Sequence, residues 1–281
     1  MYGPQLIARS LSLPSVNDSY GNLWQYHSRS DMHSKIACWA LLFDLLQHCP
    51  LLIDHIREGK VGFGINHEMR DFKTARKKNL DLVLCTPGTG DTERQDFVSL
   101  AEKYRVLLNE AEHGILASLP ALRRMPVGSV HLALEAKACM TEHIKALPRL
   151  YDELNSSHAA IHGSADFAIA AGFAVVNIAG TFVSPGRNKH PAADRPFEVT
   201  MHRQPDVTIR AIEKIKEIPR RTHSGTEGFD ALGIVVLEMA NDGSPVRVID
   251  RPPAPISSDV LHYDQMIRRI SSLYATKFGN V

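Results

Sequence analysis

Residues 130–138 of the 281-residue chain read VHLALEAKA, and residues 80–85 read LDLVLC. Both stretches are short and apolar, which favours buried strands. Charges interrupt both of them: Asp81 in the earlier stretch, and Glu135 and Lys137 in the later one. Side chains alternate between the faces of a strand, so Glu135 and Lys137 share a face. Buried charges are costly unless they are paired or bind metal, so these three require an explanation.

Outward from these strands, the chain mixes helical and extended patterns. We expect helices at residues 31–48, 51–58, 92–109, 141–162, 206–218 and 258–277, and strands at 61–65, 173–183, 232–239 and 246–249. Ser30 or Asp31 is the expected cap of the first helix and Thr141 of the helix at 141–162, and capping is the favoured role of Glu142. This mixture favours an α/β or α+β fold over an all-β one.

Composition excludes several classes of protein. A hydrophobic content of 44% and a charged content of 22% rule out a disordered, collagen-like or coiled-coil chain. The net charge of +1 disfavours a protein that coats nucleic acid by bulk positive charge, but it allows a local basic groove. No apolar run reaches the ~20 residues of a membrane span, and no secretory signal is recognisable. We therefore expect a cytoplasmic protein without membrane contact.

The four cysteines lie apart, without a CxxC pair. Reduced thiols in the core of a cytosolic protein explain them, and a zinc site is disfavoured.

Phosphodiester hydrolysis would explain the three interrupting charges. Asp81 and Glu135 can hold Mg²⁺, which prefers oxygen ligands, and the carbonyl of Ala136 is a further candidate ligand. Lys137 can orient or deprotonate the attacking water and offset developing charge on the phosphate. An ion pair at a sheet edge is the alternative explanation for the same residues.

These motifs resemble the PD-(D/E)XK nuclease superfamily, the fold of many type II restriction endonucleases. Its pattern places an acid on one strand and Glu/Asp-x-Lys on the next, followed by a helix and another strand. This chain follows the same order: Asp81, then Glu135-Ala136-Lys137, then the helix from Thr141 and the strand at 173–183. The resemblance covers residues 31–184, and the helix at 31–48 takes the place of the family's first helix. It implies a restriction-endonuclease-like mixed central sheet flanked by helices.

The resemblance also implies an activity and partners. The expected function is a Mg²⁺-dependent DNA endonuclease of a restriction or defence system, with Mn²⁺ as a substitute. The catalytic residues would be Asp81, Glu135 and Lys137. DNA would be the substrate and a homodimer the cutting unit, with a methyltransferase or another defence protein as a possible partner.

Two departures from the family pattern stand out. Leu80 precedes the first acid where the family nominally has proline. The gap before Glu135 is long and implies an insertion at about 88–128. Glu68 or Asp71 could therefore add to Asp81 as a ligand or replace it.

The domain organisation follows from these patterns. We expect an irregular N-terminal arm at 1–30, the nuclease core at 31–184, and a C-terminal extension of α+β elements at 185–281. The extension would supply dimer contacts or DNA recognition.

Two basic sets are candidate DNA-backbone contacts. They are Lys73, Arg76, Lys77 and Lys78 before the first acid, and Arg187 and Lys189 in a Pro-rich loop. A solvated hairpin or loop explains the first set equally well, and a flexible surface loop is the favoured explanation of the second.

Two other functions stay open at this point. One is a non-catalytic nucleic-acid-binding or interaction module that retains the nuclease fold, with binding dependent on residues 76–78. The other is a metal-dependent hydrolase of small molecules.

Overall fold

The computed structural model describes residues 1–72, 74–90, 95–223 and 225–279. Its centre is a mixed six-stranded sheet with the strand order β10-β9-β6-β5-β4-β3. The bounds of these strands are β3 (Gly62–Arg70), β4 (Lys77–Pro87), β5 (Val127–Cys139), β6 (Ile169–Asn177), β9 (Ala231–Glu238) and β10 (Arg247–Ile249). Strands β3, β4 and β5 pair antiparallel, β5, β6 and β9 pair parallel, and β10 is antiparallel to β9. The expected α/β class, with a mixed central sheet, is confirmed.

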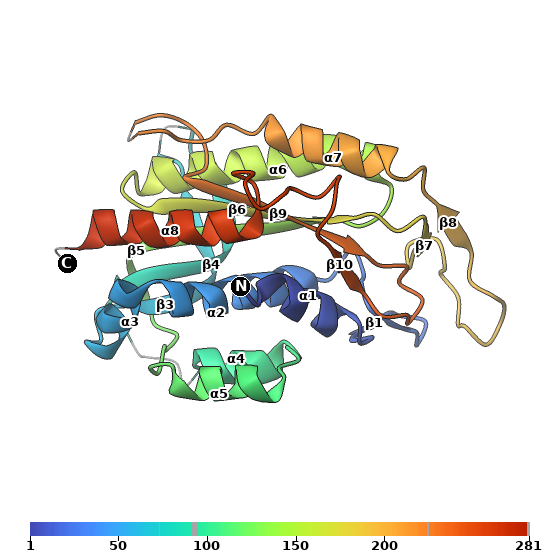
Figure 1. Cartoon of the computed structure of the whole chain (residues 1–281), viewed down its shortest axis with the longest axis horizontal. Coiled ribbons are helices and arrows are strands. Elements are labelled where there is room, and N and C mark those ends of the chain that lie inside the picture. Colours follow the sequence, from blue (N-terminus) through green and yellow to red (C-terminus); the bar gives the residue numbers. More distant parts are fainter. Residues whose placement is uncertain (73, 91–94, 224, 280–281) are drawn as a thin grey trace.

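Helices cover both faces of this sheet (Figure 1). One face carries α1 (Gly3–Leu11), α2 (Met32–His48) and α8 (Tyr263–Phe278), and the other carries α6 (His143–Ser164) and α7 (Asp206–Lys216). Alternation along β5 divides its apolar residues between the layers: Leu132 and Leu134 pack with α2 and α8, and Ala133 packs with α6. Burial on both faces explains why β4 and β5 read as nearly continuous apolar runs.

The remaining elements are short. They are α3 (Pro50–Arg57), α4 (Phe97–Lys103), α5 (Glu110–Ser118), β1 (Val16–Asn17), β2 (Leu23–Trp24), β7 (Thr181–Val183) and β8 (Val199–Met201). Helices α4 and α5 fill the expected insertion between β4 and β5. The insertion packs onto α2, where the ring of Phe97 stacks on Trp39 at 4.6 Å between centroids.

The prediction of an irregular N-terminal arm is wrong for residues 3–11, which form α1. Leu6, Ile7 and Leu11 of this helix are buried in the core. The free amides of Tyr2 and Gly3 donate to the carboxylate of Asp44 at 2.8 and 2.7 Å. A distant side chain therefore caps the helix, and Pro4 in the first turn is a local start signal that the prediction missed.

Several other elements are shorter than predicted, including the last helix, expected from residue 258 but beginning at Tyr263. For the helix expected at 92–109, residues 92–94 lie outside the described part of the chain, and α4 begins at Phe97 behind a capping box of Asp96 and Ser99. It ends before Arg105, whose φ of 53° is left-handed. The strand expected at 173–183 is divided into β6 and β7, because the chain turns away after Asn177.

The predicted cap of α6 is wrong. Glu142, not Thr141, occupies the N-cap position, with a φ of 50° and no capping hydrogen bond from its side chain. Its carboxylate instead pairs with Lys145 at 2.7 Å and Arg187 at 2.5 Å. The hydroxyl of Thr141 lies 3.1 Å from Nε2 of His202. Tertiary contacts therefore fix this helix start.

The segment 185–281 contributes β9 and β10 to the central sheet and α8 to one of its faces. All four cysteines are buried free thiols, as expected. Within the described residues, no single helix is long and apolar enough to cross a membrane, although α2 and α3, which meet at a 96° bend, pass that test as a pair.

Candidate active site

The hydrogen-bond ladder between β4 and β5 is interrupted at Asp81. Leu82 pairs with Leu134 in the regular register, but the amide of Ala136 donates to Oδ2 of Asp81 at 2.9 Å. The hydroxyl of Ser34, in the first turn of α2, donates to Oδ1 at 3.3 Å. A carboxylate thus takes the place of a backbone carbonyl, and this brings Asp81 beside the Glu-x-Lys motif of β5.

Glu135 is 1% exposed and faces two ammonium groups. Its Oε1 lies 2.7 Å from Nζ of Lys137 and 3.8 Å from Nζ of Lys78. Its Oε2 is buried and has no hydrogen-bond partner among the described residues. Buried polar atoms are rarely left unpaired, so this oxygen is the atom of the site that calls for a ligand.

Lys137 also forms an ion pair with Glu153 of helix α6. Oε2 of Glu153 lies 3.3 Å from Nζ of Lys137, and its Oε1 accepts from Nε of Arg149 at 2.6 Å. Nζ of Lys78 donates to the backbone carbonyl of Glu153 at 3.2 Å. Sequence reasoning missed Ser34, Arg149 and Glu153. Arg149 and Glu153 are four residues apart, which is typical of an ordinary pair on a helix surface.

The electrostatics follow from burial. Burial, reinforced by the charge of Asp81, raises the pKa of Glu135 to about 7. Burial likewise raises the pKa of Asp81. Burial alone would lower the pKa of Lys137, but the charge of Glu135 and its hydrogen bond outweigh that effect and raise it. The site therefore combines two acids that resist ionisation with an ammonium group that stays charged.

A cavity of about 360 Å³ opens in front of these residues. Asp81, Ala136, Lys137 and Glu153 line it, together with residues of the 26–34 segment. We refer to it as the active-site cavity. Glu135 does not line this cavity and reaches it through its partner Lys137.

The oxygen-rich donor set fits a hard cation. Carboxylates of Asp81 and Glu135 and the carbonyl of Ala136 are the ligand types that Mg²⁺ prefers, and Mg²⁺ commonly binds one or two carboxylates and keeps several waters. In the described ranges, no group of three or more His, Cys, Asp or Glu side chains is arranged to hold a metal. The fit is therefore to a partly hydrated ion, with Oε2 of Glu135 as the available buried oxygen.

The alternative acids have other contacts. Glu68 on β3 pairs with Lys77 at 2.7 Å on the surface. Asp71, just after β3, is buried and accepts a hydrogen bond from Thr74. Neither acid lines the active-site cavity.

The first basic set divides between surface and site. Lys73 lies outside the described residues, and Arg76 is exposed. Lys77 is held by Glu68, while Lys78 is directed toward Glu135 and α6. Lys78 therefore lies with Glu135 and Lys137 in the candidate site, in contrast to the expected role at the DNA backbone alone.

The second basic set lies near Glu142. Arg187 pairs with Glu142 and, at 3.0 Å, with Glu198. Lys189 lines a neighbouring cavity of about 570 Å³. Residues 28–30 line both this cavity and the active-site cavity, and Lys189 lines the former alone.

The chain matches no protein-family model, no curated protein and no solved structure.

Proposed function

We propose that the chain is a metal-dependent nuclease of the PD-(D/E)XK type that hydrolyses phosphodiester bonds in DNA. The observation that carries the proposal is the meeting of Asp81, Glu135 and Lys137 at the interrupted ladder between β4 and β5. The buried, unpartnered Oε2 of Glu135 is the expected position for a metal ligand.

The order of elements supports the same proposal. Helix α2 is followed by β3, β4 and β5 as an antiparallel meander, then by α6, and then by β6 parallel to β5. The acid lies on β4, Glu-x-Lys on β5, and a helix and a strand follow, as the resemblance requires. A restriction-endonuclease-like core is therefore part of this proposal.

The site residues have separable roles. Asp81 and Glu135, with the carbonyl of Ala136, would hold Mg²⁺ or Mn²⁺. The bound ion would polarise the scissile phosphate and lower the pKa of a bound water. Because its pKa is raised, Lys137 acts as a charged donor that orients the water and offsets negative charge, and not as a base. Glu153 keeps the Lys137 ammonium in place.

The test is nicking of supercoiled plasmid DNA with Mg²⁺ or Mn²⁺. Wild type is expected to nick, and Glu135→Ala and Lys137→Ala are each expected to lose activity by about 100-fold or more. Glu102→Gln and Lys103→Gln remove one charge of each sign from the exposed surface of α4 and should nick like wild type. Equal nicking by wild type and both site variants, or no nicking by wild type, would contradict the proposal.

Substrate and partners follow from the resemblance. We also propose, from the resemblance alone, that the cutting unit is a homodimer and that the chain acts in restriction or defence. A methyltransferase or another defence protein would be its partner. Sedimentation of the purified chain with and without a DNA duplex tests the dimer.

One observation favours a second function, a non-catalytic DNA-binding module with the same fold. The Lys137 ammonium already neutralises Glu135, and that acid does not line the active-site cavity. This alternative predicts DNA binding that depends on Arg76 and Lys77, persists in Glu135→Ala and occurs without cleavage.

A further inference from the structure

A cavity of about 660 Å³ lies between the end of α7, the start of β9 and α8. We refer to it as the α7–α8 cavity. It shares no lining residue with the active-site cavity, so the proposed nuclease activity does not account for it. Its volume falls in the range of about 300–1,000 Å³ that is typical of small-molecule sites.

Three exposed cations line the α7–α8 cavity: Lys216, Arg220 and Arg269. Nε of Arg269 donates to the backbone carbonyl of Asp230 at 3.3 Å, and its two terminal nitrogens have no partner among the described residues. No side chain in the described part of the sequence pairs with Arg220. Lys216 pairs with Glu213 at 2.9 Å in an exposed contact, which is weak.

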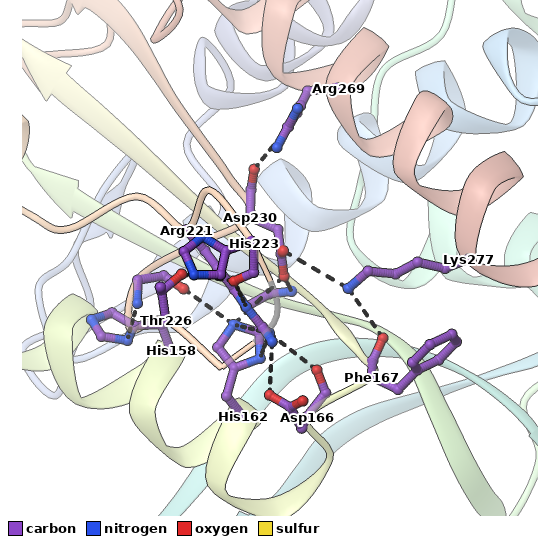
Figure 2. A network of polar contacts seen from close by, with 12 residues as sticks. His158, His162, Asp166, Phe167, Arg221, His223, Thr226, Asp230, Arg269 and Lys277 are labelled. Atoms are coloured by element: carbon purple, nitrogen blue, oxygen red, sulfur yellow. Dashed lines mark hydrogen bonds and ion pairs between the residues drawn. The ribbon is translucent and has the colours of Figure 1, made fainter.

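The two acids of the lining are already paired. Glu217 accepts from Lys214 at 2.5 Å. Asp230 accepts from the amide of Ala170 at 2.9 Å and lies 3.8 Å from Nζ of Lys277. Figure 2 shows the Lys277 side chain directed toward Asp230. The cations of the cavity are therefore not cancelled by its own acids, and an anion would be attracted there.

The inner wall is apolar. Pro219 and the exposed Val260 offer apolar surface to a ligand, and Ile218, Leu232 and Met266, at most 2% exposed, complete the apolar lining. A bare inorganic anion would leave this surface unused, and a nucleic-acid backbone would need only an open track of cations. The lining instead suits a small molecule with an anionic group at one end and an apolar or planar body.

The loop behind the cavity is held in place by a buried network (Figure 2). The Arg221 side chain, 1% exposed, donates to His162 on α6, to the Asp166 carboxylate at 2.7 Å and to the backbone carbonyl of His223 at 3.1 Å. The backbone of Gly228 contacts His158 and His162. Because these contacts anchor the loop to α6, the wall is preformed, and a ligand would not need to order it.

We propose that the α7–α8 cavity binds an organic phosphate or carboxylate of about mononucleotide size. Arg220 and Arg269 hold the anionic group, and Pro219 and Val260 contact the apolar body. Guanidinium groups bind both kinds of anion through paired hydrogen bonds, so the two chemistries are distinguished by experiment.

The experiment is calorimetric titration of the full chain in EDTA. The probes are AMP and octanoate, with adenosine and inorganic phosphate as the two halves of AMP. We expect AMP or octanoate to bind. If the site prefers a phosphate, AMP should bind at least tenfold more tightly than adenosine or inorganic phosphate. Arg220→Gln and Arg269→Gln should each weaken binding by about tenfold.

Three controls make the result specific. Arg268→Gln changes the exposed neighbour of Arg269 outside the cavity lining and should bind like wild type. Glu135→Gln should also bind like wild type, which separates this site from the proposed nuclease site. Binding of neither AMP nor octanoate, unchanged binding in both Arg220→Gln and Arg269→Gln, or displacement of the probe by a short DNA duplex would overturn the proposal.

Discussion

Nζ of Lys137 lies 2.7 Å from Oε1 of Glu135, two residues away on the same strand. Lys137 lines the active-site cavity and Glu135 is buried behind it, so the pair contributes both to the stability of the fold and to the proposed chemistry. The same ammonium group contacts Glu153 on α6, so one side chain connects the sheet to a covering helix.

Replacing Lys137 with Met should destabilise the protein by about 1–3 kcal/mol, because Glu135 would remain buried with a weaker partner. Adding Glu135→Gln to this variant should recover part of the loss, since the buried charge is then removed as well. Urea unfolding at constant pH measures both effects. A double variant less stable than Lys137→Met would contradict the pairing.

Mg²⁺ should stabilise the wild type but not Asp81→Asn or Glu135→Gln. At ten times its dissociation constant, a ligand of the folded state adds about 1.4 kcal/mol, which corresponds to a rise in Tm of about 2–4 °C for a chain of this length. Thermal unfolding with and without Mg²⁺ checks this, and Glu102→Gln is the matched control. An equal rise in Glu135→Gln would place the ion elsewhere.

Lys78 and Lys77 should differ although they are adjacent. Lys78 lies 3.8 Å from Glu135, so Lys78→Gln should lower the rate of cleavage with bound DNA. Lys77 pairs with Glu68 on the surface, so Lys77→Gln should at most weaken DNA binding and reduce its dependence on salt. Single-turnover cleavage and binding at two salt concentrations separate these effects. Equal cleavage rates for both variants would remove Lys78 from the site.

Acid should destabilise the fold through buried histidines, and His131 offers a clear case. Burial lowers the pKa of His131 from its ordinary value of 6.5 to about 4. The unfolded chain therefore takes up the proton first, and stability that is complete above pH 6.5 is lost as the pH falls toward 4. At pH 5, protonation of this histidine in the unfolded chain lowers the free energy of unfolding by roughly 2 kcal/mol relative to its value above pH 6.5.

Unfolding of His131→Phe at pH 7 and pH 5 measures this contribution. The variant should keep the stacking on Phe278 and lose less stability between these two pH values than the wild type. His113→Phe, at an exposed position on α5, should retain the wild-type dependence on pH. Identical pH dependence in both variants would argue against a neutral, buried His131.

The strands of the site were predictable because their signals are local. An apolar run interrupted by one acid marks β4, and Glu-x-Lys within an apolar run marks β5. Alternation placed Glu135 and Lys137 on one face, and the structure brings Asp81 beside them.

The features that the sequence did not predict depend on contacts between residues far apart in the chain. The cap of α1 is Asp44, 41 residues beyond Gly3, so the first 30 residues hold no capping side chain for this helix, although Pro4 marks its first turn. The start of α6 follows the pairing of Glu142 with Arg187, 45 residues later. Glu153 enters the site only because α6 lies across β5, which neither segment shows on its own.

The position of β9 beside β6 has a consequence for the integrity of the protein. Residues 171–177 of β6 pair with residues 231–237 of β9, so strands from before and after the loop at 184–198 lie side by side in one sheet. A single proteolytic cut in the exposed stretch at 192–196 would therefore leave two pieces that stay associated through this ladder. Such nicked protein would migrate as two bands under denaturing conditions and as one particle under native ones.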